Sequence, residues 1–344
     1  MTDSKMRAAV LDGCGGIEIR DLPIPVPAQG EVVIAPVGTG VCGTDLHLAS
    51  GDYPHGRFPV VPGHEFAGYI AAVGPDVSRF AEGDYVGVNP NVSCGECRWC
   101  VMGATNLCAS LFPVGVAING SVAEFVAVPE RIAFPISESI THRAAPLIEP
   151  FACVLHALER VPDWAAQEIV VFGAGSIGLM AIVLGRAEGA AGIRVVEPNA
   201  ARREAAERLG ALRAVATVGE LDRDQFDIAL DASGHPVAIA QAISALGPRG
   251  RLIQMGVASP AATVALNPYE VFAKEISIVG SNSLAEKYPA AADRMVDLQS
   301  ELDCLVTSTF SIEDYAAAMV AATSPDQIKV QVVPERRQST TTSL

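Results

Sequence analysis

The sequence predicts an α/β protein in which a doubly wound parallel sheet of six strands is joined to a second, β-rich domain. Three observations predict this fold class. The chain has 344 residues, enough for about two domains. Up to about residue 149, short apolar runs are separated by Gly, Pro and Asp, which favours β structure. From residue 150 onward, strand-like runs alternate with helix-like runs, which is typical of a parallel sheet with helices on both faces.

In the first part of the chain, the apolar or alternating runs predict five short strands with no long helix between them. We expect these strands at residues 7–10, 17–20, 31–37, 66–73 and 85–88.

In the second part, a helix at 151–160 precedes six strand-like runs, and this number suits a doubly wound nucleotide-binding sheet. The strands are expected at 169–172, 193–196, 214–217, 227–230, 251–255 and 276–279, and the intervening helices at 177–188, 200–209, 236–246 and 268–273. Helices at 288–299 and 312–322 and a strand at 329–333 follow, and they could return to the first domain. We therefore expect one domain from 1–150 and 286–344 and another from 151–285.

Composition excludes several classes of protein. Half of the residues are hydrophobic and 18% are charged, which excludes a disordered chain. The formal net charge is −15 and no Lys/Arg-rich block occurs, so nucleic acid and anionic membrane surfaces would repel the chain. The sequence contains no run of 18 apolar residues and no apolar segment near Met1 of the kind found in secretion signals. We expect a cytoplasmic protein.

A glycine motif follows the first strand of the second domain. Gly173, Gly175 and Gly178 form G-x-G-x-x-G, with Ser176 and Ile177 at the start of the next helix. Glycine allows the tight turn and the close approach of backbone to pyrophosphate, and the helix N-terminus offers N–H groups to phosphate. The motif predicts a dinucleotide site.

Glu197 ends the next strand, 19 residues beyond Gly178, where a carboxylate is expected to meet the ribose 2′-hydroxyl. A 2′-phosphate would face a like charge there, so we predict NAD over NADP. Arg202 and Arg203 lie nearby and could contact a phosphate, although a solvated helix face is the favoured interpretation of both.

Four of the eight cysteines, Cys94, Cys97, Cys100 and Cys108, fall within fifteen residues. Four thiolates can close a tetrahedral shell around zinc and leave no position for substrate, so the expected role is structural. An iron–sulfur cluster is the alternative, because some cluster-binding runs have similar spacing.

A second metal-ligand pattern lies earlier in the chain. Cys42 falls in the run GVCGTDLH at 40–47, and His64 and Glu65 fall in PGHE at 62–65. A thiolate, an imidazole and carboxylates suit a zinc ion with an open position. Between the two motifs, Tyr53, His55 and Phe58 are candidates for the lining of a substrate pocket.

With these motifs, the chain resembles the zinc-dependent medium-chain dehydrogenase/reductase family over nearly its whole length. The Glu149-Pro150 segment and the stretches at 231–234, 250–253 and 278–281 agree as well. The resemblance implies a Rossmann domain, a GroES-like catalytic domain with a structural zinc lobe at 94–108, a second, catalytic zinc ion, and NAD. It also implies homodimers or homotetramers that pair through the nucleotide domain.

The resemblance carries site roles over to individual residues. Cys42 and His64 look like catalytic zinc ligands. Glu149 stands where one branch of the family has a ligand cysteine and another has glutamate, and Glu65 can bind or exchange onto the metal in the polyol-type branch. Which of the two glutamates is bound at rest stays open.

Three further residues acquire roles from the same resemblance. Asp45 looks like the carboxylate that orients His64. Thr44 and His47 look like a relay that passes the proton of the alcohol, through the cofactor ribose, to solvent.

The implied reaction interconverts a secondary alcohol and its ketone by hydride transfer. Glu149-Pro150-Phe151 and Glu65 resemble the polyol and threonine dehydrogenase branches, and we favour a polyol or another vicinal hydroxy compound. The arginine and aromatic residue that polyol enzymes often carry after the sixth strand are replaced by Asn282-Ser283, which argues against sorbitol itself. The alternatives are an amino-alcohol substrate such as threonine, carbonyl reduction as the physiological direction, or a catalytically silent NAD-binding regulatory protein.

Overall fold

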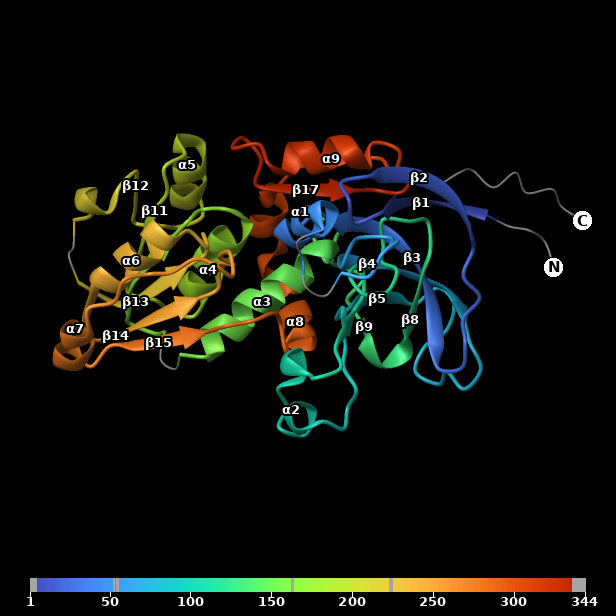
Figure 1. Cartoon of the computed structure of the whole chain (residues 1–344), viewed down its shortest axis with the longest axis horizontal. Helices are drawn as coiled ribbons and strands as arrows, with labels where there is room; N and C mark the ends of the chain where they lie inside the picture. The colour runs from blue at the N-terminus through green and yellow to red at the C-terminus, as the bar shows by residue number, and fades with distance from the viewer. Residues whose placement is uncertain (1–4, 52, 54–55, 162–163, 223–224, 336–344) are drawn as a thin grey trace, which may run out of the picture. The chain divides into compact units, whose positions relative to one another are not determined.

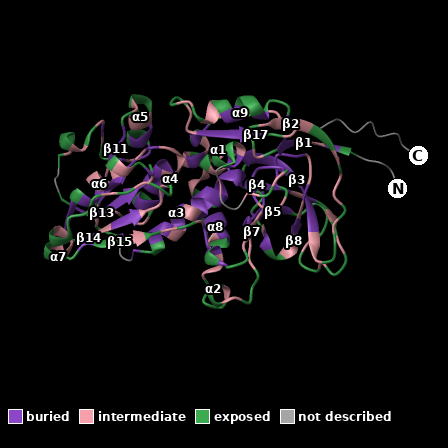
Figure 2. Ribbon diagram, in the orientation of Figure 1, coloured by how far each residue is buried: buried purple, intermediate pink, exposed green. Residues whose placement is uncertain are grey.

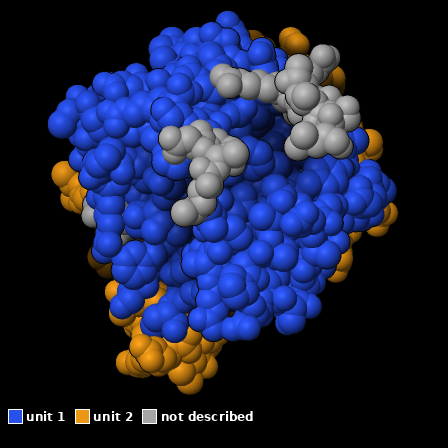
Figure 3. All heavy atoms as spheres, turned by 90° about the vertical axis from the view of Figure 1, so that its right-hand side faces the viewer, with its two compact units in different colours: residues 1–94, 110–147, 306–344 blue, residues 95–109, 148–305 orange. Residues whose placement is uncertain are grey.

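The computed structural model describes residues 5–51, 53, 56–161, 164–222 and 225–335. The chain forms two compact units (Figures 1 and 3). Unit 1 comprises residues 1–94, 110–147 and 306–344, and unit 2 comprises residues 95–109 and 148–305. None of the helices in the described part of the chain is long and apolar enough to cross a membrane.

Unit 1 is built on a seven-stranded sheet with the order β16-β17-β3-β4-β5-β9, and β8 pairs with β3 off this path. All neighbouring strands are antiparallel except β16 and β17. The strands are β3 (Glu31–Gly40), β4 (Glu65–Val73), β5 (Tyr85–Val88), β8 (Val126–Pro129), β9 (Ala133–Pro135), β16 (Val306–Phe310) and β17 (Lys329–Val332).

The core of this sheet consists of β-branched and aromatic side chains, among them Val32, Ile34 and Phe66, all without exposed surface (Figure 2). A separate two-stranded hairpin joins β1 (Lys5–Leu11) to β2 (Ile17–Pro23). Unit 1 also contains the helices α1 (Gly43–Ser50) and α9 (Tyr315–Ala322) and the short pair β6 (Asn91–Val92) and β7 (Phe112–Pro113).

Unit 2 contains a parallel sheet of six strands with the order β12-β11-β10-β13-β14-β15. In sequence rank this is 3-2-1-4-5-6, the doubly wound order that places a dinucleotide beside the first strand. The strands are β10 (Glu168–Phe172), β11 (Gly192–Val196), β12 (Arg213–Val215), β13 (Phe226–Asp231), β14 (Leu246–Gln254) and β15 (Ser277–Gly280). The predicted fold class is confirmed.

Six main helices accompany this sheet, and the short α2 (Arg98–Val101) lies in the cysteine lobe. They are α3 (Ile148–Glu159), α4 (Ser176–Ala187), α5 (Ala200–Arg208), α6 (Pro236–Ser244), α7 (Pro268–Lys274) and α8 (Tyr288–Leu302). Apolar residues of β10, β13 and β14, such as Phe172, Ala229 and Leu252, form a buried core with α6.

Several features differ from the sequence expectations. Helix α1 and the strands β6, β7, β8, β9 and β16 were not expected. Helix α9 begins at Tyr315 rather than at residue 312, because Asp314 and Ser311 form a hydrogen-bonded turn before it. The expected return to the first domain at residue 286 also differs from the compact units. Helix α8 belongs to unit 2 because it packs against α3 and α4, and the chain enters unit 1 only at Val306.

Candidate metal and dinucleotide sites

Pairing between β3 and β4 brings the two predicted ligand motifs of unit 1 together. Gly40, the last residue of β3, pairs with Glu65, the first residue of β4. Cys42 lies two residues beyond Gly40 and His64 one residue before Glu65, so both lie at the same end of this ladder. The ligand atoms of Cys42, His64 and Glu65 consequently lie within 4.8 Å of one another.

The turn into β4 has a backbone that requires glycine. Gly63 has φ of +98°, and a Cβ atom there would lie 2.7 Å from Thr39 Cγ2. Its carbonyl oxygen accepts a hydrogen bond from the backbone N–H of Ser121 at 3.0 Å. This tight turn aims His64 at the end of β3.

Cys42 is the N-cap residue of α1, and the cap chemistry fixes its position. Asp45 Oδ2 accepts a hydrogen bond from the Cys42 backbone N–H at 2.8 Å, and the two residues form a reciprocal capping box. The cap thus fixes the position of a candidate metal ligand.

Asp45 also reaches His64. Its Oδ1 atom lies 3.6 Å from His64 Nδ1, and the two side chains are almost fully buried. Burial by itself lowers the pKa of His64, but the Asp45 carboxylate and Cys42 beside it raise this pKa well above its usual value. With Nδ1 facing Asp45, Nε2 becomes the ligand nitrogen, the arrangement commonly found in zinc–histidine–carboxylate sets.

The donors in this cluster fit a zinc ion. A thiolate, an imidazole and a carboxylate converge at a buried point, and each is a typical zinc ligand. Glu65 is 1% exposed, and its carboxylate forms an ion pair with Lys329, a residue that the sequence analysis did not consider.

The predicted relay residues both lie on α1. Thr44 is half-buried, whereas His47 is exposed. They are three residues apart, so they share one side of the helix. His47 therefore has the solvent access that the end of a proton relay needs.

Glu149 is placed by α3 in unit 2. It lies in the first turn of that helix and is 6% exposed. The thiol of Cys153, one turn later, donates a hydrogen bond to Glu149 Oε1 at 3.7 Å. Coordination of the catalytic metal by Glu149 stays a prediction. On the same helix, burial lowers the pKa of His156, as the positive charges of Arg160 and Lys287 also do.

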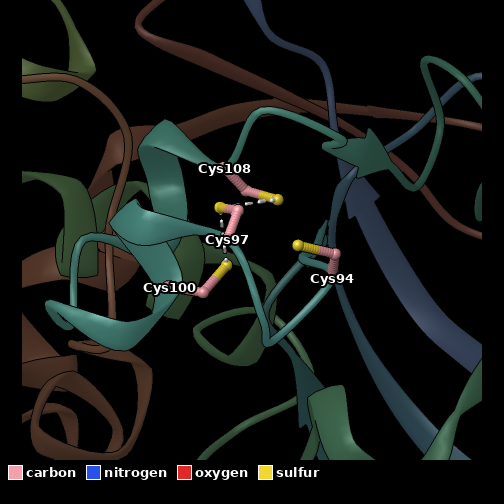
Figure 4. A group of neighbouring side chains, drawn as sticks. All are labelled: Cys94, Cys97, Cys100 and Cys108. Atoms are coloured by element: carbon pink, nitrogen blue, oxygen red, sulfur yellow. Dashed lines mark hydrogen bonds between the residues drawn. The ribbon is translucent and has the colours of Figure 1, made fainter.

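The four cysteines of the lobe converge as predicted (Figure 4). The sulfur atoms of Cys94, Cys97, Cys100 and Cys108 lie within 4.8 Å of one another. Cys97 Sγ lies 3.6 Å from that of Cys100 and 3.9 Å from that of Cys108. Four thiols facing one point fit a structural zinc ion.

Two contacts connect the lobe to the segment after β15. Asn106 Nδ2 donates a hydrogen bond to the carbonyl oxygen of Asn282 at 2.7 Å, and the Thr105 hydroxyl bonds to Glu286 at 2.5 Å. The segment that carries Asn282-Ser283 is thus held by the cysteine lobe.

The glycine motif occupies the turn from β10 to α4. Gly173 has φ of +96°, and a Cβ atom on Gly178 would lie 1.9 Å from the Gly173 carbonyl oxygen. Gly175 is the N-cap of α4, which begins with Ser176 and Ile177. The turn, the open N-cap and the helix N-terminus match the geometry that binds a pyrophosphate.

Glu197 follows β11 and is 6% exposed. Its Oε2 accepts a hydrogen bond from the Ala174 backbone N–H at 2.8 Å, and its Oε1 accepts one from that of Asn199 at 2.9 Å. The carboxylate therefore fixes the glycine turn, and its further lone pairs can still accept from a ribose hydroxyl.

The two arginines near Glu197 have local roles. The Arg202 backbone N–H donates to Asn199, the N-cap of α5. Arg203 Nη1 donates to the carbonyl oxygens of Glu197 and Pro198 at 2.9 and 2.7 Å. The side chain of Arg203 is thus engaged with the backbone of the turn.

The structure adds functional candidates that the sequence analysis missed. Besides Lys329, Asp231 at the end of β13 is fully buried and accepts hydrogen bonds from Ser233, Gly234 and Gln254. Its position before a Ser-Gly turn was the available signal. Of the proposed pocket residues, Tyr53 and Phe58 pack against the core of unit 1. His55 lies outside the described residues.

Comparisons with known proteins identify the family of this chain. The family described as alcohol dehydrogenase GroES-like domain matches residues 28–138, and the family described as zinc-binding dehydrogenase matches residues 176–297. The chain is 33% identical to sorbitol dehydrogenase of Bacillus subtilis, over 96% of this chain and 98% of that one. It is 36% identical to D-altritol 5-dehydrogenase of Agrobacterium fabrum (80% and 84%) and 30% identical to L-threonine 3-dehydrogenase of Chromobacterium violaceum (94% and 97%).

Solved structures have the same fold. A zinc-binding dehydrogenase from Sinorhizobium meliloti bound to NADP superposes with a TM-score of 0.92 at 29% identity, covering 96% of this chain and all of that one. An alcohol dehydrogenase from E. coli complexed with NADH superposes with a TM-score of 0.87 at 29% identity, covering 96% and 99%. This chain combines a buried thiolate–imidazole–carboxylate cluster, a four-cysteine lobe and a glycine turn. It belongs to the zinc-dependent medium-chain alcohol dehydrogenase family.

Proposed function

We propose that this chain is a zinc-dependent NAD(H) oxidoreductase that interconverts a secondary alcohol and its ketone by hydride transfer. The observation that carries the proposal is the buried cluster of Cys42, His64 and Glu65, two of whose members are oriented by Asp45. When bound, zinc supplies a Lewis acid for the alcohol oxygen, and NAD supplies the hydride acceptor.

We assign the following roles to residues of this chain. Cys42 and His64 hold the metal, with Glu149 or Glu65 as the carboxylate ligand. Thr44 takes up the proton that leaves the alcohol while its own hydroxyl proton passes to the cofactor ribose, and exposed His47 carries the proton from the ribose to solvent.

NAD is the proposed cofactor because Glu197 places a buried negative charge beside the glycine turn. A 2′-phosphate in that position would be repelled, whereas a 2′-hydroxyl can donate to the carboxylate. Arg203 Nη1 donates to the backbone carbonyl oxygens of Glu197 and Pro198, so this nitrogen is already engaged with the turn.

A polyol or another vicinal hydroxy compound is the proposed substrate. The similarity to sorbitol and D-altritol dehydrogenases supports this class, and the similarity to L-threonine 3-dehydrogenases supports an amino alcohol as the second candidate. Asn282-Ser283 stand where polyol enzymes often carry an arginine and an aromatic residue after the sixth strand, which argues against sorbitol itself.

The test is NADH formation by zinc-loaded protein against polyols, simple secondary alcohols and threonine, each with and without a chelator. Chelator-sensitive turnover of a polyol is the expected result. A preference for threonine would select the second candidate. Zinc-loaded protein that binds NADH but turns over nothing in the panel, in either direction, would favour a silent regulatory protein.

We further propose that the protein acts as a homodimer or homotetramer in the cytoplasm. Strand β15 is the last strand of its sheet, and Ile278 on it is 49% exposed. Tyr269 and Phe272 on the neighbouring helix α7 are 72% and 78% exposed, so this edge offers apolar surface to a second copy. A reducing compartment would keep the four-cysteine lobe available for zinc. Sedimentation velocity tests the assembly, and a monomer at micromolar concentration would contradict it.

A further inference from the structure

Strand β17 contributes a buried lysine to the candidate metal cluster. Lys329 is the first residue of that strand and is only 4% exposed. Its ammonium donates a hydrogen bond to Glu65 Oε1 at 2.7 Å and forms an ion pair with Oε2 as well. It also donates to the Val41 carbonyl oxygen at 3.1 Å, next to the ligand Cys42.

The sheet determines this position. Gln331 pairs with Gly40 across β17 and β3, and the Val41 N–H donates to the Val330 carbonyl oxygen at 2.9 Å. Gly40 also makes room for the ion pair, since a Cβ atom there would lie 2.0 Å from Glu65 Oε2 and 3.0 Å from Lys329 Cε. The backbone of β3 and β17 is thus arranged around this pair.

The ion pair and a metal ion compete for the same carboxylate. The ligand atoms of Glu65, Cys42 and His64 lie within 4.8 Å of one another, so Glu65 can reach a metal held by the other two. Yet both of its oxygens face the ammonium of Lys329. Breaking a buried ion pair is costly unless another charge replaces the lost partner.

We propose that Lys329 is a positioning residue that holds Glu65 off the catalytic metal and so keeps a coordination position open for substrate. This inference rests on the proposed function for the identity of the metal site. It also bears on the choice between the two glutamates, because Glu65 is then a reserve ligand and not the resting one.

The test measures metal binding without substrate or cofactor. Co²⁺ replaces zinc, its affinity is measured by competition with a chelator, and its visible absorption reports the coordination geometry. The spectrum of a Cys42→Ser variant is subtracted to remove the signal of the four-cysteine lobe. In Lys329→Met, Glu65 loses its partner and should turn onto the metal. We expect about tenfold or greater gain in Co²⁺ affinity, the scale on which groups surrounding the ligands act, together with a changed spectrum.

Two further variants separate this role from a structural one. Lys329→Arg keeps the charge and should retain the parent spectrum. The double variant Lys329→Met/Glu65→Gln replaces the ion pair by a neutral pair, and it should return to the parent affinity and spectrum. It remains informative even if Lys329→Met does not fold.

Three results would overturn the inference: unchanged or weaker Co²⁺ binding in Lys329→Met, a spectral change that persists in the double variant, or tenfold weaker binding by the double variant. Because these measurements need no turnover, an inactive parent protein would count against the proposed function alone.

Discussion

Replacement of Asp45 by Asn tests whether one carboxylate organises two metal ligands. Asp45 Oδ2 accepts from the Cys42 backbone N–H at 2.8 Å, and Oδ1 lies 3.6 Å from His64 Nδ1. An amide of the same shape has only one accepting oxygen. This oxygen can therefore accept a hydrogen bond from the Cys42 N–H or from the His64 ring, but not from both. The NH₂ group of the amide then faces the remaining donor.

The magnitude follows from these two contacts. Loss of an N-cap interaction costs about 1 kcal/mol of stability. Loss of the carboxylate behind a ligand histidine weakens metal binding by about 10- to 100-fold, which is about 1.4–2.8 kcal/mol of binding free energy. If the amide keeps the cap, most of the effect should appear in zinc affinity rather than in the stability of the metal-free protein.

The assay is zinc affinity by chelator competition, together with thermal unfolding of the metal-free protein. Asp12→Asn is a matched control, because exposed Asp12 also accepts two backbone N–H groups, those of Cys14 and Gly16, in a turn outside the metal cluster. The control should alter unfolding alone. Zinc affinity of Asp45→Asn within twofold of the parent would refute the assigned role of Asp45.

Three other variants have defined expectations. Glu197→Gln should lower the ratio of kcat/KM with NAD to kcat/KM with NADP by at least tenfold, both measured with the same alcohol. An unchanged ratio would show that Glu197 does not select the cofactor. Tyr315→Phe should leave stability unchanged or raise the melting temperature, since the Tyr315 hydroxyl is buried without a hydrogen bond among the described residues. A clear loss of stability would show that the hydroxyl has a hydrogen-bond partner. Burial lowers the pKa of His156, so the folded state binds a proton there less readily than the unfolded state and loses stability as pH falls below about 6.5. His156→Gln should lose less thermal stability than the parent between pH 7.5 and 5.5, and equal losses would contradict this.

Much of unit 2 could be predicted from the sequence because its signals are local. Each strand of the parallel sheet is a short apolar run, and the glycine turn between β10 and α4 has a spacing imposed by backbone geometry. Strand β15 shows the limit of that reasoning. Its apolar run predicted a strand, but not that Ile278 would be half exposed, because exposure depends on the packing of the whole sheet.

Helix α1 was not predicted, for a different reason. Asp45 and Leu48 are its only buried residues, so it lacks the apolar stripe by which a helix is recognised in sequence. Its ends are instead set by the Cys42–Asp45 capping box and by Gly51, which has φ of +77°. Strand β16 was missed because Val306 is its only fully buried residue.

The metal cluster is positioned by one residue that is near its ligands in sequence and by another that is far from them in sequence. Asp45 positions Cys42 and His64 from within the motif that carries Cys42, so sequence spacing could identify this part of the site. Glu65 is controlled by Lys329, which lies 264 residues away and reaches it only because β17 pairs with β3. In sequence, Lys329 is an ordinary charged residue at the start of a short strand, and only the sheet register shows that its side chain is buried. A substitution in β17 can therefore change metal coordination while both ligand motifs stay intact.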